Sequence, residues 1–231
     1  MVGVQGAIVL AGGRSSRLGG VSKAGLEFEG ETLLARAVAV ARGALADSAP
    51  AASGAAAGPE PVAEPGRIAV VGPAEASAEL LPAGHGCRLV REEPPFAGPA
   101  AALDAGMRAL ASTSGRVLVL ACDMPGAGTA VVALLRWLEE HPESTGALAV
   151  DGGRDQPLAA IYPAEALRSA LAAIDATRGL QNAPVHPLVA RLEAAGVARV
   201  DVPAGSTADV DTWTDAAALG VGPGRGNAPG L

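Results

Sequence analysis

The sequence predicts an α/β fold, in which a mostly parallel sheet lies between helices in a single three-layer domain. Short apolar runs typical of buried strands alternate along the chain with longer segments of helical spacing, and this alternation indicates parallel strands joined by helices. With 231 residues, of which 49% are hydrophobic, the chain is long enough to bury one sizeable core. We therefore expect one domain.

The first half of the chain begins with a strand at Gly6–Leu10, because this apolar run ends in the glycines of a tight loop. A helix is expected at Glu31–Leu45, where apolar residues recur at helical spacing. The further elements expected here are strands at Arg67–Val71, Cys87–Val90 and Arg116–Ala121 and helices at Pro99–Ala111 and Thr129–Glu140.

In the second half, two strand-like runs at Ala147–Val150 and Pro157–Tyr162 flank a polar stretch that contains Gly152 and Gly153. Either a hairpin or an irregular excursion fits this pattern. The elements expected after it are helices at Pro163–Ala173 and His186–Ala195 and a final strand at Ala198–Val202.

Two stretches lack the apolar periodicity that packing requires. Residues 48–66 are mostly Ala, Pro, Gly and Ser, and residues 220–231 are rich in Gly and Pro. We expect a folded domain over residues 1–219, a disordered loop at 48–66 within it, and a flexible tail at 220–231.

Composition excludes several classes of partner. A net charge of −7 and five aromatic residues give neither the basic footprint nor the stacking platforms of a nucleic-acid-binding protein, and an anionic membrane also requires a basic surface. The first basic residue is Arg14, so no secretory signal is evident, and Cys87 and Cys122 lack the spacing of a disulfide or zinc motif. We expect a cytoplasmic protein with no nucleic-acid or membrane partner.

The first loop holds the most informative residues. Gly12 and Gly13 follow the first strand and can let the backbone approach a phosphate, and Arg14, Arg17 and Lys23 add positive charge. Lys23 is the only lysine among 17 basic residues, which suggests that this position requires a compact ammonium. The spacing matches neither the dinucleotide-binding fingerprint nor the P-loop.

The pattern L-A-G-G-x-S-x-R-x-G-x-x-x-K resembles the signature of nucleotidyltransferases that activate phosphate-bearing compounds, and most closely that of the molybdenum cofactor guanylyltransferase family. The resemblance implies a Rossmann-like sheet of the nucleotide-diphospho-sugar transferase type and a loop that wraps a triphosphate. The L-A-G-G form favours GTP, whereas related cytidylyltransferases tend to show L-A-A-G. The residues that carry the match are Leu10, Ala11, Gly12, Gly13, Arg17 and Lys23.

Acidic residues follow two predicted strands. Asp123 comes directly after an apolar strand, where one carboxylate suits Mg²⁺, and it resembles the metal-binding Asp of the family's C-D-x-P segment. Asp209 and Asp211 point to one side of an extended chain, and either can complete the metal site. Their D-x-D-T resembles the cytidylyltransferase pattern more than the N-x-N-T of guanylyltransferases. Alternatively, Asp211 or Thr212 caps a helix at 213–219.

The segment from Glu93 to Gly98 and Pro99 resembles the family's acidic residue followed by G-P-L-A-G, which lines the base and ribose. The resemblance implies that Glu93 contacts the base. Gln156 stands where the family has the histidine of an H-P-T segment that faces the second substrate. The nucleotide-binding residues implied are Leu10, Ala11, Gly12, Gly13, Arg14, Lys23, Glu93, Gly98, Pro99 and Asp123.

The resulting expectation is an Mg²⁺-dependent nucleotidyltransferase. It transfers GMP from GTP to molybdopterin and releases pyrophosphate, with Lys23, Arg17 and Asp123 as catalytic residues and Asp123 and Asp211 as metal ligands. Proteins of molybdenum cofactor delivery are possible partners. Two alternatives stay open: a cytidylyltransferase or a sugar- or alcohol-phosphate nucleotidyltransferase of the same fold, and a nucleotide-binding regulatory module without turnover.

Overall fold

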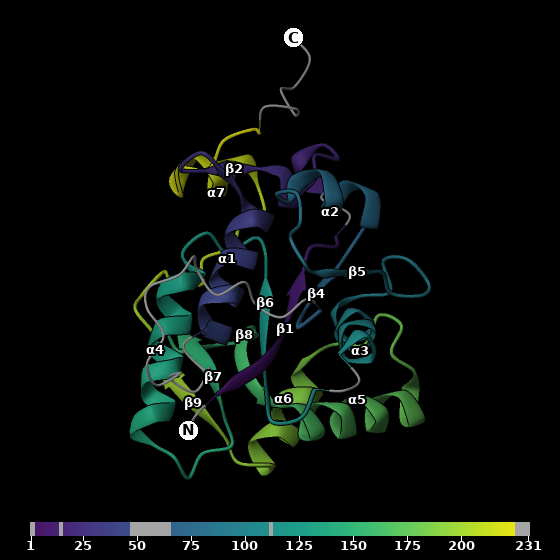
Figure 1. Cartoon of the computed structure of the whole chain (residues 1–231), viewed down its shortest axis with the longest axis vertical. Coiled ribbons are helices and arrows are strands. Elements are labelled where there is room, and N and C mark those ends of the chain that lie inside the picture. The colour runs from purple at the N-terminus through teal and green to yellow at the C-terminus, as the bar shows by residue number, and fades with distance from the viewer. Residues whose placement is uncertain (1–2, 14–15, 47–65, 111–112, 225–231) are drawn as a thin grey trace.

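The computed structural model of the chain describes residues 3–13, 16–46, 66–110 and 113–224. Figure 1 shows a central sheet with helices on both sides. Within the described residues the sheet has seven strands, in the spatial order β5 (Arg88–Val90), β4 (Ile68–Val71), β1 (Val4–Leu10), β6 (Arg116–Ala121), β8 (Arg154–Pro163), β7 (Gly146–Asp151) and β9 (Val197–Asp201). The predicted fold class, an α/β domain with a mostly parallel sheet, is confirmed.

Six of these strands run in one direction, and β8 runs against both of its neighbours. The open question about the polar stretch between β7 and β8 is resolved as a hairpin. Gly152 and Gly153 at its tip have φ of 57° and 76°, the backbone that a tight two-residue turn requires.

Helices cover both faces of the sheet, except that α7 (Trp213–Ala218) packs against the first loop instead. The other helices of the described residues are α1 (Leu33–Ala46), α2 (Ala74–Leu80), α3 (Pro99–Ala109), α4 (Ala127–Glu140), α5 (Ala164–Arg178) and α6 (His186–Ala194). Two single 3₁₀ turns at Ser16–Leu18 and Lys23–Gly25 and a small hairpin of β2 (Glu27–Phe28) and β3 (Glu31–Thr32) connect β1 to α1. None of the helices in the described ranges is long and apolar enough to cross a membrane.

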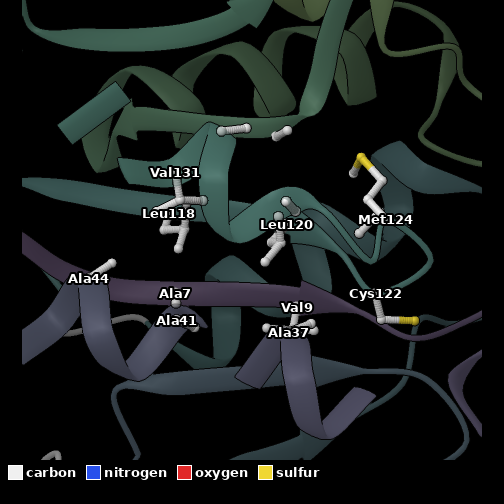
Figure 2. Close-up of a cluster of buried hydrophobic side chains, with 14 of the residues drawn as sticks. Ala7, Val9, Ala37, Ala41, Ala44, Leu118, Leu120, Cys122, Met124 and Val131 are labelled. Atoms are coloured by element: carbon white, nitrogen blue, oxygen red, sulfur yellow. The ribbon is translucent and has the colours of Figure 1, made fainter. Parts of the chain in front are cut away.

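Alternate residues of the central strands supply two separate cores. Val9 of β1 and Leu120 of β6 pack with α1 and α4 on one face, whereas Ile8 and Val119 pack with α3, α5 and α6 on the other. Figure 2 shows side chains of β1, α1 and β6 meeting in the first of these cores, with Val131 of α4 beside them. Because strand side chains alternate between faces, a strand buried on both sides is apolar throughout, as the short runs of the sequence predicted.

A third, smaller cluster joins distant parts of the chain. Leu18 and Leu26 of the first loop pack with Val210, and Val221 lies in the same cluster. Residues 27 and 222 also exchange two main-chain hydrogen bonds, of 3.0 and 2.8 Å. The start of the predicted tail is therefore part of the folded chain. The loop predicted at 48–66, apart from Gly66, and the tail beyond residue 224 lie outside the described residues.

Candidate active site

A cavity of about 1020 Å³ opens at the carboxyl ends of β1, β6 and β7, the edge of an open α/β sheet at which ligands bind. Its walls come from residues of the segments 10–13, 22–23, 92–102, 121–124, 151–158 and 182–209. These segments span most of the chain, so the cavity exists only in the folded molecule.

The first loop is held between the two strands that flank β1. The Ala11 amide donates to the Val71 carbonyl of β4 over 2.8 Å, and the Cys122 amide after β6 donates to the Leu10 carbonyl over 3.0 Å. A Cβ at Gly72 would lie 3.0 Å from the Ala11 carbonyl carbon, so glycine at position 72 permits this close approach. The backbone at the start of the loop is therefore fixed.

Past that point the loop opens towards the cavity. Gly12 and Gly13 are both exposed and both line the cavity. Around Gly13 no heavy atom of the described residues lies within 4 Å of where a Cβ would stand. A ligand can therefore contact the main chain at these two residues without meeting a side chain.

Lys23 brings together acids from two other segments. Its Nζ donates to Oδ2 of Asp123 over 2.9 Å and to Oδ1 of Asp211 over 2.5 Å. Asp123, Asp209 and Asp211 each offer an oxygen within 4.8 Å of the others. The cluster of these three carboxylates, called the acidic cluster below, thus includes both partners of the chain's single lysine.

The charges in this cluster affect one another. Burial lowers the pKa of Lys23, but the negative charges and hydrogen bonds of Asp123 and Asp211 outweigh burial and raise that pKa above its ordinary value. Burial raises the pKa of Asp209, and the charges of Asp123 and Asp211 raise it further. Lys23 is therefore fully protonated at neutral pH, and Asp209 has an unfavourable position among like charges.

The donor set of the acidic cluster fits a magnesium ion. Carboxylate oxygens are the protein ligands that Mg²⁺ prefers, and the ion usually takes only one or two carboxylates together with waters and phosphates. All three carboxylates remain partly or fully exposed, which leaves room for such ligands. The neighbouring thiol of Cys122 is buried, and burial raises its pKa, so it is not a competing ligand.

The position of Val210 explains why the side chains of Asp209 and Asp211 lie on one side of the chain. The amide of Val210, between them, donates to the Asp123 carbonyl over 3.0 Å, and the Val210 side chain is buried. Thr212 caps α7, and Asp215 completes a capping box with it. Thr212 thus takes the capping role that the sequence left open between positions 211 and 212, and the Asp211 carboxylate is directed to Lys23.

The N-terminus of α3 forms a second wall of the cavity. Gly98 is the N-cap with φ of 93°, a backbone conformation that favours glycine, and Pro99 is the first residue of the helix. The Asn182 amide donates to the Ala97 carbonyl over 2.6 Å and holds this turn. Free amides at a helix N-terminus attract anions or hydrogen-bond acceptors of a ligand.

Two adjacent glutamates face different cavities. Glu92 is 6% exposed, lines the large cavity and accepts a hydrogen bond from the Phe96 amide over 3.0 Å. Glu93 lines a separate cavity of about 520 Å³ beside α3. The resemblance implied that Glu93 contacts the base. In the structure Glu92, not Glu93, lines the large cavity. The chain bends at Glu93, and the two neighbouring side chains face different cavities.

Phe96 adds an aromatic surface that the sequence did not single out. It lines the large cavity, is 39% exposed and has φ of 62°, which is unusual for a bulky residue. The Arg91 guanidinium lies 5.2 Å from its ring centroid. Strained backbone of this kind is typical of ligand-binding segments.

The hairpin of β7 and β8 forms the wall opposite the first loop. Oδ1 of Asp151 accepts a hydrogen bond from the Gly205 amide over 3.0 Å. Oδ2 accepts from the Thr207 amide and hydroxyl over 3.0 and 2.8 Å. Burial raises the pKa of Asp151, but these hydrogen bonds outweigh it and hold the pKa below its ordinary value. Asp151 thereby fixes the loop that leads to Asp209.

Most site residues expected from the sequence meet at the large cavity. Arg17 is exposed and does not line it; its Nη1 donates to Oδ2 of Asp211 over 3.1 Å. Asp211 also lies outside the lining and joins the site through Lys23. Arg14 falls outside the described residues. The expected residues that line the cavity are Leu10, Ala11, Gly12, Gly13, Lys23, Gly98, Pro99, Asp123, Gln156 and Asp209.

Other lining residues gave little signal in the sequence. Asp151 ends an apolar strand, as Asp123 does, and that shared position was a usable clue. Asn182 and Thr207 lie in loops whose approach to the cavity depends on tertiary structure alone.

Comparison with known proteins gives consistent matches. The family model described as the MobA-like NTP transferase domain matches residues 7–187. A protein of Opitutus terrae, named a probable molybdenum cofactor guanylyltransferase, is 36% identical over 163 residues, which make up 70% of this chain and 68% of that protein.

Solved structures show the same fold. Molybdopterin-guanine dinucleotide biosynthesis protein A from Archaeoglobus fulgidus superposes with a TM-score of 0.60 at 19% identity, over 92% of this chain and 95% of that one. The 4-diphosphocytidyl-2C-methyl-D-erythritol synthase of Anaerococcus prevotii gives 0.62 at 13% identity, over 94% of each chain. At these identities the likeness concerns the fold alone.

Proposed function

The chain belongs to the MobA-like NTP transferase family and is a nucleotidyltransferase, and we propose that it transfers GMP from GTP to molybdopterin in an Mg²⁺-dependent reaction. The relative from Opitutus terrae, named for this guanylyl transfer, supports the choice of substrates. The L-A-G-G start of the first loop supports GTP over CTP.

One observation carries the proposal: Lys23 Nζ lies 2.9 Å from the Asp123 carboxylate, at the edge of a cavity whose wall is the open backbone of Gly12 and Gly13. A triphosphate needs backbone amides and cations along its length, and the first loop offers both. The cavity, of about 1020 Å³, is large enough for a nucleotide together with part of a second substrate.

In the proposed reaction a terminal phosphate oxygen of the acceptor attacks the α-phosphorus of GTP. The bond from the α-phosphorus to the bridging oxygen of the β-phosphate breaks, and pyrophosphate leaves with that electron pair. A phosphate monoester is already a nucleophile at neutral pH, so the protein needs no general base; it aligns the groups in line and offsets negative charge.

The residues divide this work among them. Lys23 donates hydrogen bonds to the α-phosphate and the departing pyrophosphate, where negative charge increases. Arg17, exposed and paired with Asp211, adds positive charge for the leaving group. Asp123 would hold the metal together with Asp211 or Asp209, and a metal bound there would supply positive charge to offset the negative charge of the phosphate oxygens.

The base is proposed to lie between Phe96 and the N-terminus of α3. Glu92 is the carboxylate that reaches this part of the cavity, and a carboxylate accepts hydrogen bonds from the guanine N1–H and amino groups. The Phe96 ring offers a flat apolar surface for the base.

A cytidylyltransferase is the second candidate, and the carboxylates of Asp209 and Asp211 favour it. The D-x-D-T sequence at this point resembles the cytidylyltransferase pattern. Both acids lie in the acidic cluster, the proposed metal site.

The test is to incubate the purified protein with Mg²⁺, one nucleoside triphosphate and molybdopterin, and to measure pyrophosphate release and the dinucleotide product. We expect a product with GTP that depends on Mg²⁺. A preference for CTP would replace the guanylyl assignment with the second candidate. Turnover only with sugar or alcohol phosphates would show that molybdopterin is not the acceptor. GTP binding without turnover of any acceptor would indicate a regulatory module.

A further inference from the structure

The chain has a single lysine, Lys23, and its ammonium lies within the acidic cluster. Lys23 Nζ hydrogen-bonds to carboxylate oxygens of Asp123, the first proposed metal ligand, and of Asp211, one of the two residues proposed to complete the site. We infer that Lys23 and a divalent cation exclude each other from the acidic cluster, so that the cation enters fully only when a nucleotide draws the ammonium to its phosphates. This inference rests on the proposed function, which supplies the cation and the phosphates.

Lys23 occupies one oxygen on each of the two carboxylates, and the inferred ion competes for the same oxygens. An Mg²⁺ ion lies about 2.0–2.1 Å from its oxygen ligands. An ion that takes Oδ2 of Asp123 and Oδ1 of Asp211 must therefore lie between these two oxygens, where Lys23 Nζ now makes contacts of 2.9 and 2.5 Å. The ammonium has to leave before the ion can take both ligands.

Burial strengthens the conflict between the two positive charges. The side chains of Lys23 and Asp123 are 20% and 22% exposed, so water screens their interaction only in part. Release of Lys23 without new partners would leave a partly buried ammonium unpaired, which is costly. Phosphate oxygens beside the first loop are the new partners that make its release favourable.

Arg17 provides the internal comparison. It also contacts Asp211, but through the other carboxylate oxygen, Oδ2, at 3.1 Å, and its side chain is 72% exposed. It carries the same charge as Lys23 and does not stand between the two proposed ligands. Loss of Arg17 therefore tests the effect of charge alone, and loss of Lys23 tests the effect of charge and position together.

The first experiment measures Mn²⁺ binding to the full chain without nucleotide, by the loss of the free-ion electron paramagnetic resonance signal. It compares the wild type with Lys23→Met and Arg17→Met, each checked for an unchanged melting profile. We expect Lys23→Met to bind Mn²⁺ about tenfold more tightly than the wild type, and Arg17→Met to differ from the wild type by no more than about threefold. Equal gains in the two variants, or no gain in Lys23→Met, would overturn the inference.

The second experiment needs no variant, because a single lysine gives a single side-chain signal in protein labelled with ¹³C-lysine. We expect titration with Mg²⁺ to shift the Lys23 ε-carbon signal at the same midpoint at which the ion binds, and that midpoint to fall to lower Mg²⁺ concentration when a non-hydrolysable GTP analogue is present. Saturation by Mg²⁺ with an unmoved lysine signal would show both cations in the site together and would overturn the inference.

The outcomes separate this inference from the proposed function. If the wild type with the GTP analogue binds neither Mn²⁺ nor Mg²⁺, the metal-dependent reaction itself is wrong. If it binds the ion with the analogue, but Lys23→Met without nucleotide gains nothing, the reaction stands and only the exclusion is wrong.

Discussion

Glu92 and Glu93 are neighbours in the sequence but face different cavities. Glu92 is buried in the wall of the large cavity, and Glu93 faces the smaller one. Their chemistry is identical, so only their direction separates their roles. This makes them a matched pair for testing how the base is recognised.

We predict that Glu92→Gln lowers kcat/KM for GTP by about 10- to 100-fold, since a hydrogen bond to a charged group contributes about 1.5–3 kcal/mol. The loss should be smaller with inosine triphosphate, which lacks the amino group of guanine. Steady-state kinetics with both triphosphates measures this difference. Glu93→Gln is the control and should keep the GTP preference; if it lost that preference instead, Glu93 would be the contact after all.

Lys23→Arg keeps the charge at the centre of the acidic cluster but changes its shape. We predict that this variant loses about 100-fold in kcat, because a planar guanidinium cannot occupy the position of a compact ammonium between phosphates and carboxylates. Pyrophosphate release measures the loss. Arg136→Lys, the reverse exchange at a side chain 79% exposed on α4, is the control and should match the wild type. Full activity of Lys23→Arg would remove the requirement for an amine.

Residue-scale prediction from the sequence succeeded where a motif fixes direction as well as position. Lys23 follows a glycine loop and Asp123 follows a strand end, and the folded chain brings the two side chains within 2.9 Å of each other, while their roles in catalysis stay predictions. Glu93 could not be distinguished from Glu92, because no feature of the sequence between β5 and α3 reveals where the chain bends and which side chain faces the large cavity. Phe96 was missed because its positive φ is a property of the folded turn.

At the scale of elements, the loop between β9 and Asp209 depends on one carboxylate at the end of β7. Asp151 accepts three hydrogen bonds from Gly205 and Thr207. Asp155 lies in the same hairpin, but its carboxylate pairs with Arg199 over 2.9 and 2.8 Å instead of holding the loop. The two acids therefore carry the same charge, but only Asp151 holds the loop in place.

We predict that Asp151→Asn lowers the apparent affinity for the divalent cation about tenfold, because the loop that carries Asp209 loses its fixed position and groups that orient ligands have effects of this size. Faster amide hydrogen exchange over residues 203–211 should accompany the change. Asp155→Asn, which removes the same charge from the same hairpin, should alter neither measurement. Equal effects of the two variants would show that the charge matters and the hydrogen bonds do not.

Element prediction from the sequence was limited by the signals that each element carries. The long amphipathic helices and the apolar strands were located to within a few residues. Helix α2 was not predicted, because its seven residues contain little apolar surface and bury only Ser77. The hairpin of β7 and β8 was left open because glycines at a turn permit several backbones, and pairing with β6 selects one.

At the scale of the whole molecule, the charges of Asp209 and Asp151 have opposite effects on the stability of the fold, and both effects depend on pH. The pKa of Asp209 is raised, so its charge destabilises the fold at neutral pH and this cost disappears as the pH falls towards the unfolded value of about 4. The pKa of Asp151 is lowered, so its contribution is present above about pH 4 and is lost as the pH falls through the lower folded value.

We therefore predict that Asp209→Asn unfolds at a higher temperature than the wild type at pH 7 and that this gain shrinks at pH 5. Asp151→Asn should unfold at a lower temperature than the wild type at pH 7, with a difference that vanishes only at strongly acidic pH. Calorimetry of the nucleotide-free proteins at several pH values measures both trends. A stabilising effect of Asp209→Asn that grew as the pH fell would contradict the assignment.

The contact between the first loop and the segment at 209–222 has a consequence for how the protein is made. Lys23 and Asp211 are separated by 188 positions in the sequence, and the small apolar cluster of Leu18, Leu26, Val210 and Val221 joins the same two regions. A ribosome synthesises the first of these regions early and the second late. The growing chain can form β1, α1 and β4 long before Asp211 emerges, so the acidic cluster is assembled only after nearly all of the domain has been translated.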